Sequence, residues 1–112
     1  MIFVTAKREK DIYLLKVSGH ADYARGNDIV CAGVSAIVAA LFGWVKNCPD
    51  EIKKVFSMTS EDKLSDGMGE AEIYVKATEV FCPAFMTAVI GLAQIAQAFP
   101  KNVTVDLRFT RT

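Results

Sequence analysis

Histidine is almost absent from this chain, because His20 is the one imidazole among 112 residues. Cysteine is also scarce, with three residues that show neither CxxC spacing nor the spacing of metal ligands. Structural zinc sites need four closely spaced Cys or His ligands, so we expect no metal and no other cofactor. An odd number of cysteines does not suit a disulfide framework, and we expect reduced thiols in a cytoplasmic protein.

An excess of charge of either sign is missing as well, since 13 Lys and Arg residues balance 13 Asp and Glu residues. Proteins that bind nucleic acid usually show a basic excess or stripe, so no direct nucleic-acid partner is expected. The first residues are apolar and then charged, which is the wrong order for a signal peptide. The apolar runs are interrupted and are interpreted as too short to span a membrane, so no membrane partner is expected.

Strand-like runs at residues 2–9 and 11–19 open the chain, with the polar residues KREKD read as the turn of a β-hairpin. A loop with a glycine near each end follows at residues 19–27. Asn27 and Asp28 are both good N-caps, so a helix is predicted from about residue 28 to residue 47, ending before Cys48-Pro49. The apolar residues of this helix extend nearly all the way round it, which indicates burial on more than one side.

The second half of the chain predicts a strand at residues 51–60, in preference to a last helical turn, and a clearly alternating strand at residues 69–77. A second helix is predicted around Pro83 and ends at Phe99-Pro100. The last strand is expected to point four side chains inward: Val103, Val105, Leu107 and Phe109. The order ββαββαβ predicts an α+β fold with two layers, a mostly antiparallel sheet and two helices.

Two helices that are apolar nearly all round exceed what one sheet face of so short a chain can cover. The remaining apolar surface predicts a homodimer.

The arrangement of His20 and Cys31 indicates nucleophilic chemistry. Cys31 falls in the first helical turn, where unpaired N–H groups and the helix dipole favour a thiolate. Asp28 opposes the thiolate by its charge, but its side chain can instead cap the Cys31 N–H or hold an imidazolium. The loop between residues 20 and 31 can fold back, so His20 can protonate a leaving group while first-turn N–H groups stabilise an oxyanion. Ser35 lies one turn after Cys31 and can hydrogen-bond into the site.

Each of these residues also has a structural interpretation. Cys31 can be a small buried hydrophobe at a helix start, and His20 can be a loop residue bonded to backbone. Ser35 can bond to a carbonyl of its own helix. Cys82 also lies in a first helical turn, but it has no second histidine as a partner. Cys48 and Cys82 are both interpreted as structural.

The residues "SGHA", followed by a short loop and then "GNDIVCAGVSA", resemble the signature G-H-A … G-x-D-I-V-C-A-x-V-S of the ribosomal-processing cysteine proteases, the Prp family. The resemblance implies one cysteine-protease domain over residues 1–112, with Cys31 as nucleophile and His20 as its catalytic partner. It implies supporting roles for Asp28, Ser35 and Gly19. Such proteases act as homodimers in ribosome biogenesis, and they remove the N-terminal extension of the precursor of large-subunit ribosomal protein number twenty-seven.

Two other functions remain open at this point. A ribosome-associated module can bind the same peptide without cutting it, and then replacing Cys31 changes nothing. A thiol redox sensor needs a resolving cysteine near Cys31, such as Cys82. For the protease, the Gly19–Gly26 loop is predicted to act as a lid over the peptide.

Overall fold

The computed structural model describes residues 1–21, 28–59 and 70–110 of the chain. Its elements follow the order ββαββαβ, with a single 3₁₀ turn at Pro49–Glu51, and this confirms the predicted α+β fold. The elements are β1 (Ile2–Glu9), β2 (Ile12–Gly19), α1 (Ile29–Asn47), β3 (Ile52–Met58), β4 (Glu70–Ala77), α3 (Phe81–Ala98) and β5 (Val103–Thr110).

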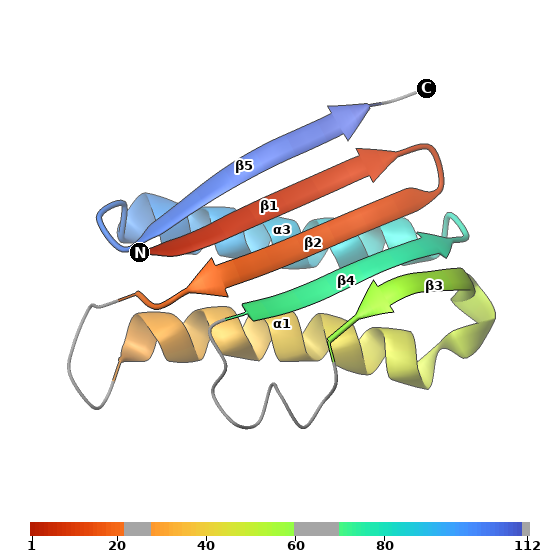
Figure 1. Ribbon diagram of the computed structural model, residues 1–112, viewed down its shortest axis with the longest axis horizontal. Helices are drawn as coiled ribbons and strands as arrows, with labels where there is room; N and C mark the ends of the chain where they lie inside the picture. Colours follow the sequence, from red (N-terminus) through yellow and green to blue (C-terminus); the bar gives the residue numbers. More distant parts are fainter. Residues whose placement is uncertain (22–27, 60–69, 111–112) are drawn as a thin grey trace.

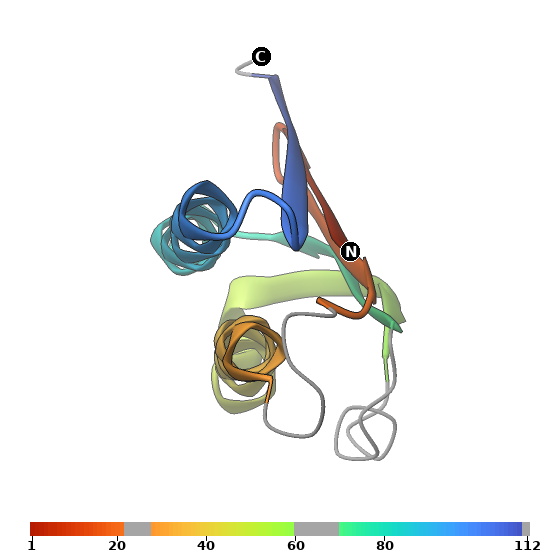
Figure 2. The same cartoon turned by 90° about the vertical axis from the view of Figure 1, so that its left-hand side faces the viewer.

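One five-stranded sheet has the strand order β3-β4-β2-β1-β5. Three of its four pairings are antiparallel, while β5 runs parallel to β1, so that the last strand lies beside the first (Figure 1). Both helices cover the same face of the sheet, and no other described helix or strand covers the opposite face (Figure 2). The described part of the chain therefore forms two layers, as the sequence predicts.

The β1–β2 hairpin has a tighter turn than the sequence suggested. Glu9 pairs with Ile12, so the turn is only Lys10 and Asp11, and Lys10 adopts a left-handed φ of 56°. The prediction that the whole KREKD segment forms the turn was wrong, because Lys7 and Arg8 continue the alternation of β1 and pair with β2. Two-residue hairpin turns match the twist of the strands that they join, which favours the longer ladder.

The predicted ends of the helices agree with the structure to within two residues. Helix α1 ends at Asn47, and Cys48 is its C-cap, directly before Pro49. Helix α3 has Pro83 in its first turn and ends at Ala98, before Pro100. Proline lacks an N–H and has a fixed φ, so it fits the first turn of a helix but cannot continue a helix at its C-terminal end. The strand preferred for residues 51–60 is confirmed as β3.

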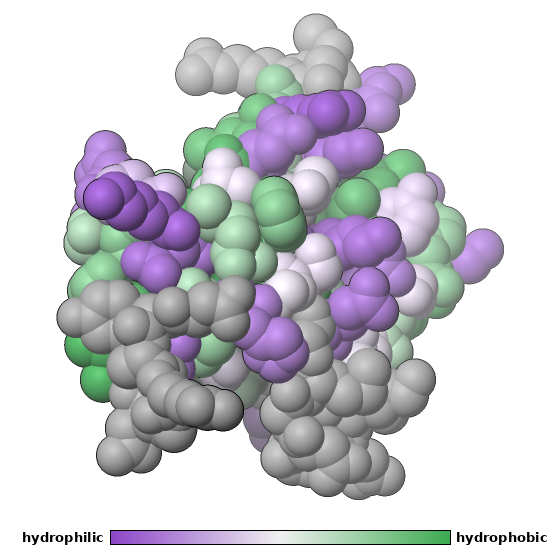
Figure 3. Space-filling model, turned by 60° about the vertical axis from the view of Figure 1, so that its left-hand side comes forward, coloured by the Kyte–Doolittle hydropathy of each residue, from purple (hydrophilic) through white to green (hydrophobic). Residues whose placement is uncertain are grey.

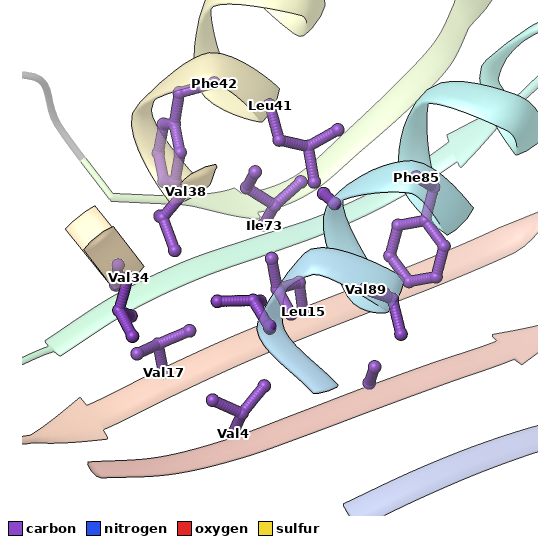
Figure 4. Close-up of a cluster of buried hydrophobic side chains, with 14 of the residues drawn as sticks. Val4, Leu15, Val17, Val34, Val38, Leu41, Phe42, Ile73, Phe85 and Val89 are labelled. Carbon is purple, nitrogen blue, oxygen red and sulfur yellow. The ribbon is translucent and has the colours of Figure 1, made fainter. Parts of the chain in front are cut away.

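The hydrophobic core lies between the helix layer and the sheet (Figure 4). Alternate residues of the central strands point toward the helices and are almost fully buried, as the period of two predicts. Figure 4 shows these side chains meeting those of α1 and α3: Val4, Leu15, Val17, Val34, Val38, Leu41, Phe42, Ile73, Phe85 and Val89. Burying one such side chain stabilises the fold by roughly 1.5–3 kcal/mol, so this layer holds the site elements in place.

The edge strand β5 is only partly covered. Val103 is buried, but Leu107 and Phe109 are 46% and 39% exposed, so the prediction that all four alternating residues point into the core was wrong for these two. They pair with Ala6 and Arg8 and lie on the helix side of the sheet. The far end of β5 extends beyond the helix layer (Figure 2), and nothing in the described part of the chain covers it there.

By length and composition alone, α1 and α3 are each long enough to cross a bilayer. The expectation that the apolar runs are too short was therefore wrong on this criterion. In the structure, both helices lie in one layer against the sheet and contribute to the same core.

Candidate active site

Three chain segments meet at one end of the sheet. Strand β2 ends there at Gly19, α1 begins there at Ile29, and the turn between α3 and β5 lies beside them (Figure 1). Figure 3, which turns the left-hand side of Figure 1 forward, shows apolar and polar side chains interspersed, with no single large apolar area on this view. The residues singled out from the sequence lie at this end of the sheet or in the α1 turns that begin there.

Gly19 ends β2 in a conformation that other residues rarely adopt. Its φ is +93°, and a Cβ atom at this position would collide with the main-chain oxygen of Met1. Glycine alone tolerates both the positive φ and the close approach. The terminal ammonium of Met1 donates a hydrogen bond to the carbonyl oxygen of His20, so the start of β1 fixes the backbone just after Gly19. Gly19 therefore sets the direction in which the chain leaves the sheet at His20.

Asp28 is the N-cap of α1, one of the two caps that the sequence left open. Its Oδ1 accepts hydrogen bonds from the N–H groups of Val30 and Cys31, both at 3.0 Å. Its carbonyl oxygen accepts a further bond from Ala32 at 3.0 Å. Cys31 is therefore the third residue of the helix. The expectation that first-turn N–H groups stabilise an oxyanion does not hold for these three residues, because Asp28 already occupies their N–H groups.

The thiol of Cys31 points toward the end of β2. The main-chain N–H of Ala21 donates to Cys31 Sγ at 3.2 Å, and Cys31 packs partly buried against the core. Ala21 itself is 1% exposed, so this amide is held in a protected position. The N–H donor that faces the sulfur belongs to the peptide bond between His20 and Ala21. The backbone next to the imidazole thus contacts the thiol.

Asn102 completes this group and was not found from the sequence. Its side-chain Nδ2 donates to the carbonyl oxygen of Ala21 at 2.8 Å. Its own carbonyl oxygen accepts from the N–H of Ile2 at 2.8 Å, which ties the turn before β5 to the start of β1. The amide of Asn102 therefore reaches the site from a position 81 residues further along the chain than Ala21.

His20 and Ser35 are placed less tightly. The side chain of His20 is exposed, and within the described residues its imidazole makes no hydrogen bond to Cys31. Ser35 is also exposed, and its hydroxyl makes no bond to Cys31 in the described part of the chain, so the structure does not bring it into the site. The predicted lid falls mostly on residues 22–27, which lie outside the described residues.

The other two cysteines lie away from this end of the sheet. Cys48 caps the far end of α1, where partial burial and the Glu51 carboxylate raise the pKa of its thiol. Cys82 lies in the first turn of α3, packs against the core and interacts with Tyr13. All three cysteines are free thiols. Among the described residues no group of three His, Cys, Asp or Glu side chains is placed to hold a metal ion.

Comparison with known proteins finds relatives by sequence and by fold. The ribosomal processing cysteine protease Prp of Mycoplasma genitalium is 30% identical over 93 residues, which cover 82% of this chain and 85% of that protein. The ribosomal processing protease Prp from S. aureus, solved with a covalently linked product peptide, has a TM-score of 0.74 at 21% identity. With a substrate peptide the same protease gives 0.68 at 20% identity, and each match covers 96% of this chain and 100% of the other.

A protein from Streptococcus mutans gives a TM-score of 0.68 at 24% identity over 98% of this chain and 96% of its own. These structures establish the shared fold. The sequence model of the family described as cysteine protease Prp matches residues 1–104, and the chain therefore belongs to the Prp family of cysteine proteases.

Proposed function

We propose that this protein is a cytoplasmic cysteine endopeptidase that removes the N-terminal extension of a precursor of large-subunit ribosomal protein number twenty-seven. The observation that carries the proposal is the placement of Cys31 in the first turn of α1, with its sulfur 3.2 Å from the Ala21 N–H. The thiolate is the nucleophilic form of cysteine, and the Ala21 N–H is placed to donate a hydrogen bond to this sulfur. Family membership supports the same reaction class.

In the proposed reaction, Cys31 Sγ attacks the carbonyl carbon of the scissile peptide bond and a carbon–sulfur bond forms. The carbon–nitrogen bond then breaks, and the leaving amine takes a proton from the imidazolium of His20. Water next attacks the thioester and gives its proton to His20, which releases the extension with a free carboxylate and restores the thiolate. Only Cys and His side chains are needed for these proton and electron movements.

His20 is supported in its role by backbone geometry. The residue directly after it donates to the Cys31 sulfur, and the start of β1 holds its carbonyl oxygen. The imidazole itself is exposed, while the residue that follows it is in contact with the sulfur. Hydrogen bonds of catalytic groups are often longer in enzymes without substrate and tighten when substrate binds.

The substrate is expected to bind as an extended chain. Of the two edge strands, β5 begins at the same end of the sheet as Cys31, where Val103 pairs with Ile2 (Figure 1). An edge strand has one side without a strand partner, and it can pair with a peptide through main-chain hydrogen bonds. A precursor tail that adds to an edge in this way would present its scissile bond near the start of α1.

We also propose that the protein acts as a homodimer. A groove of about 580 Å³ runs between the helices and is lined by Ile37, Ala40, Leu41, Trp44, Pro83, Ala84, Thr87, Ala88 and Gly91. Ala40 is exposed in this groove, so Ala40→Glu should shift the molecular mass measured by light scattering from that of a dimer to that of a monomer. Val55→Glu, an exposed change on β3, is the control and should leave the mass unchanged. A monomeric wild type would contradict this part of the proposal.

The experiment that tests the protease is mass spectrometry of the ribosomal precursor after incubation with wild type, Cys31→Ala and Cys48→Ala. We expect wild type and Cys48→Ala to produce a new N-terminus and Cys31→Ala to produce none while it stays folded. Full cleavage by Cys31→Ala would refute the nucleophile. Absence of cleavage by wild type would instead favour a binding module that holds the peptide uncut.

A further inference from the structure

We propose that Asn102 is a positioning residue for Cys31, and this inference rests on the proposed function. Its carboxamide holds the Ala21 carbonyl and so keeps the Ala21 N–H directed at the sulfur. Two hydrogen bonds form the connection: Asn102 Nδ2 donates to Ala21 O at 2.8 Å, and Ala21 N donates to Cys31 Sγ at 3.2 Å. No feature of the signature around His20 and Cys31 points to a residue so near the other end of the chain.

The position of Ala21 makes it sensitive to this contact. Ala21 follows the end of β2 and precedes the residues that lead to α1, so no sheet ladder fixes its orientation. Among the described residues, its N–H donates to Cys31 and its C=O accepts from Asn102. Ala21 is 1% exposed, and a buried main-chain carbonyl strongly favours a hydrogen-bonded position, so the residue can rotate if its carbonyl loses the Asn102 donor.

The turn itself does not require asparagine at position 102. Asparagine is common in turns because it tolerates a left-handed φ, but Lys10 is the one non-glycine residue with a positive φ among the described residues. The main-chain groups of Asn102 bond to Phe99 and Ile2, and any residue with an N–H and a C=O can make those bonds. The carboxamide is therefore the part that needs explanation, and its described partner is Ala21.

The chemical consequence concerns the charge of the sulfur. A thiol is a weak hydrogen-bond acceptor, whereas a thiolate is a strong one, so a well-directed N–H stabilises the charged form more than the neutral form. Removing the Asn102 amide should therefore reduce the thiolate population at neutral pH. Removing this amide should reduce the rate of the chemical step more than it weakens substrate binding, because Asn102 contacts Ala21 and is not proposed to contact the peptide.

The test compares Asn102→Ala and Asn102→Asp with the control Asn47→Ala. Asn47 also donates its side-chain amide to a main-chain carbonyl, that of Gly43 at 2.7 Å, but at the far end of α1. Asn102→Asp keeps the shape of asparagine and cannot donate when ionised, so it separates hydrogen bonding from packing. Iodoacetamide alkylation of Cys31, resolved by peptide mass spectrometry across pH, reports the thiolate. Kinetics on a synthetic peptide spanning the precursor cleavage site report kcat and KM.

We expect both Asn102 variants to alkylate at Cys31 about tenfold more slowly at pH 7, which corresponds to about 1.4 kcal/mol. Their alkylation profiles should move to higher pH, and kcat should fall about tenfold while KM stays within about twofold. Asn47→Ala should match wild type in alkylation rate, pH profile, kcat and KM. Wild-type profiles and kcat in Asn102→Ala would overturn the inference, and so would a wild-type profile in Asn102→Asp.

A measurement on the unaltered protein covers the case in which a variant does not fold. The amide proton of Ala21, followed by NMR, should titrate together with the alkylation profile of Cys31, and no titration would overturn the inference. The two proposals fail separately. Cleavage by Cys31→Ala refutes the nucleophile and leaves the alkylation result standing, whereas an inactive Cys31→Ala with unaltered Asn102→Ala refutes only the positioning role.

Discussion

Replacing the N-cap of α1 should destabilise the protein by an amount that its two hydrogen bonds predict. Asp28→Ala removes the acceptor for the N–H groups of Val30 and Cys31. Loss of an N-cap costs about 1 kcal/mol, with a range of about 0.5–2. Loss of a carboxylate at the positive end of the helix dipole adds about 0.3–1 kcal/mol. We therefore expect the free energy of unfolding to fall by about 1.5 kcal/mol.

The assay is urea unfolding followed by circular dichroism at pH 7, with two further variants. Asp28→Asn keeps an equally good cap and loses only the charge, so it should lose less than about 1 kcal/mol. Asp106→Ala removes an exposed carboxylate paired with Arg108 at 3.1 Å, and it should change stability by less than about 0.5 kcal/mol. Equal stability of Asp28→Ala and Asp106→Ala would refute the capping argument, and equal losses in the two Asp28 variants would assign the effect to charge.

Three further predictions concern other parts of the fold. Gly19→Ala should lower stability by at least about 2 kcal/mol in urea unfolding, because a left-handed φ alone costs about 1–2 kcal/mol and the new Cβ meets Met1; a change below 0.5 kcal/mol, on the order of a surface substitution, would contradict it. Phe85→Ala should cost about 3–5 kcal/mol, since its ring is fully buried and lies 5.0 Å from that of Tyr13; a wild-type melting temperature would refute this. Burial, and to a lesser extent the Cys82 thiol, raises the pKa of Tyr13 from its ordinary value of 10.0, so the phenol ionises at lower pH in the unfolded chain than in the folded protein. The neutral phenol therefore stabilises the folded state below about pH 10, and this contribution is lost as the pH rises. Wild type should therefore lose more stability than Tyr13→Phe between about pH 9 and pH 11, and parallel losses would exclude the mechanism.

The local sequence was sufficient to predict the elements and the core face of most strands. Strict alternation in residues 70–77 identified a half-buried strand, and cap and breaker residues located the ends of both helices. These features depend on neighbours within a few positions. The exposure of Leu107 and Phe109 could not be read in the same way, because it depends on how far the helix layer extends over the sheet edge.

In the candidate site, too, the contacts between residues close in sequence could be predicted and the contacts between distant residues could not. Asp28 as a cap of the Cys31 N–H follows from a spacing of three residues, and the sequence already offered that possibility. The use of the first-turn N–H groups was misjudged, since one carboxylate oxygen accepts two of them. Asn102 was missed because its contact with Ala21 depends on the parallel pairing of β5 with β1, and alternation in a strand does not specify its partner.

The parallel pairing of the last strand with the first has a consequence for the timing of activity. Ile2 lies opposite Val103, so this contact can form only after residue 103 has been synthesised and has left the ribosome. Contacts between residues so far apart in sequence form late, because the entropy of closing the loop must be overcome first. The support that Asn102 gives to Ala21 is therefore absent from the nascent chain. A newly made protease would gain its full reactivity only after β5 has paired with β1.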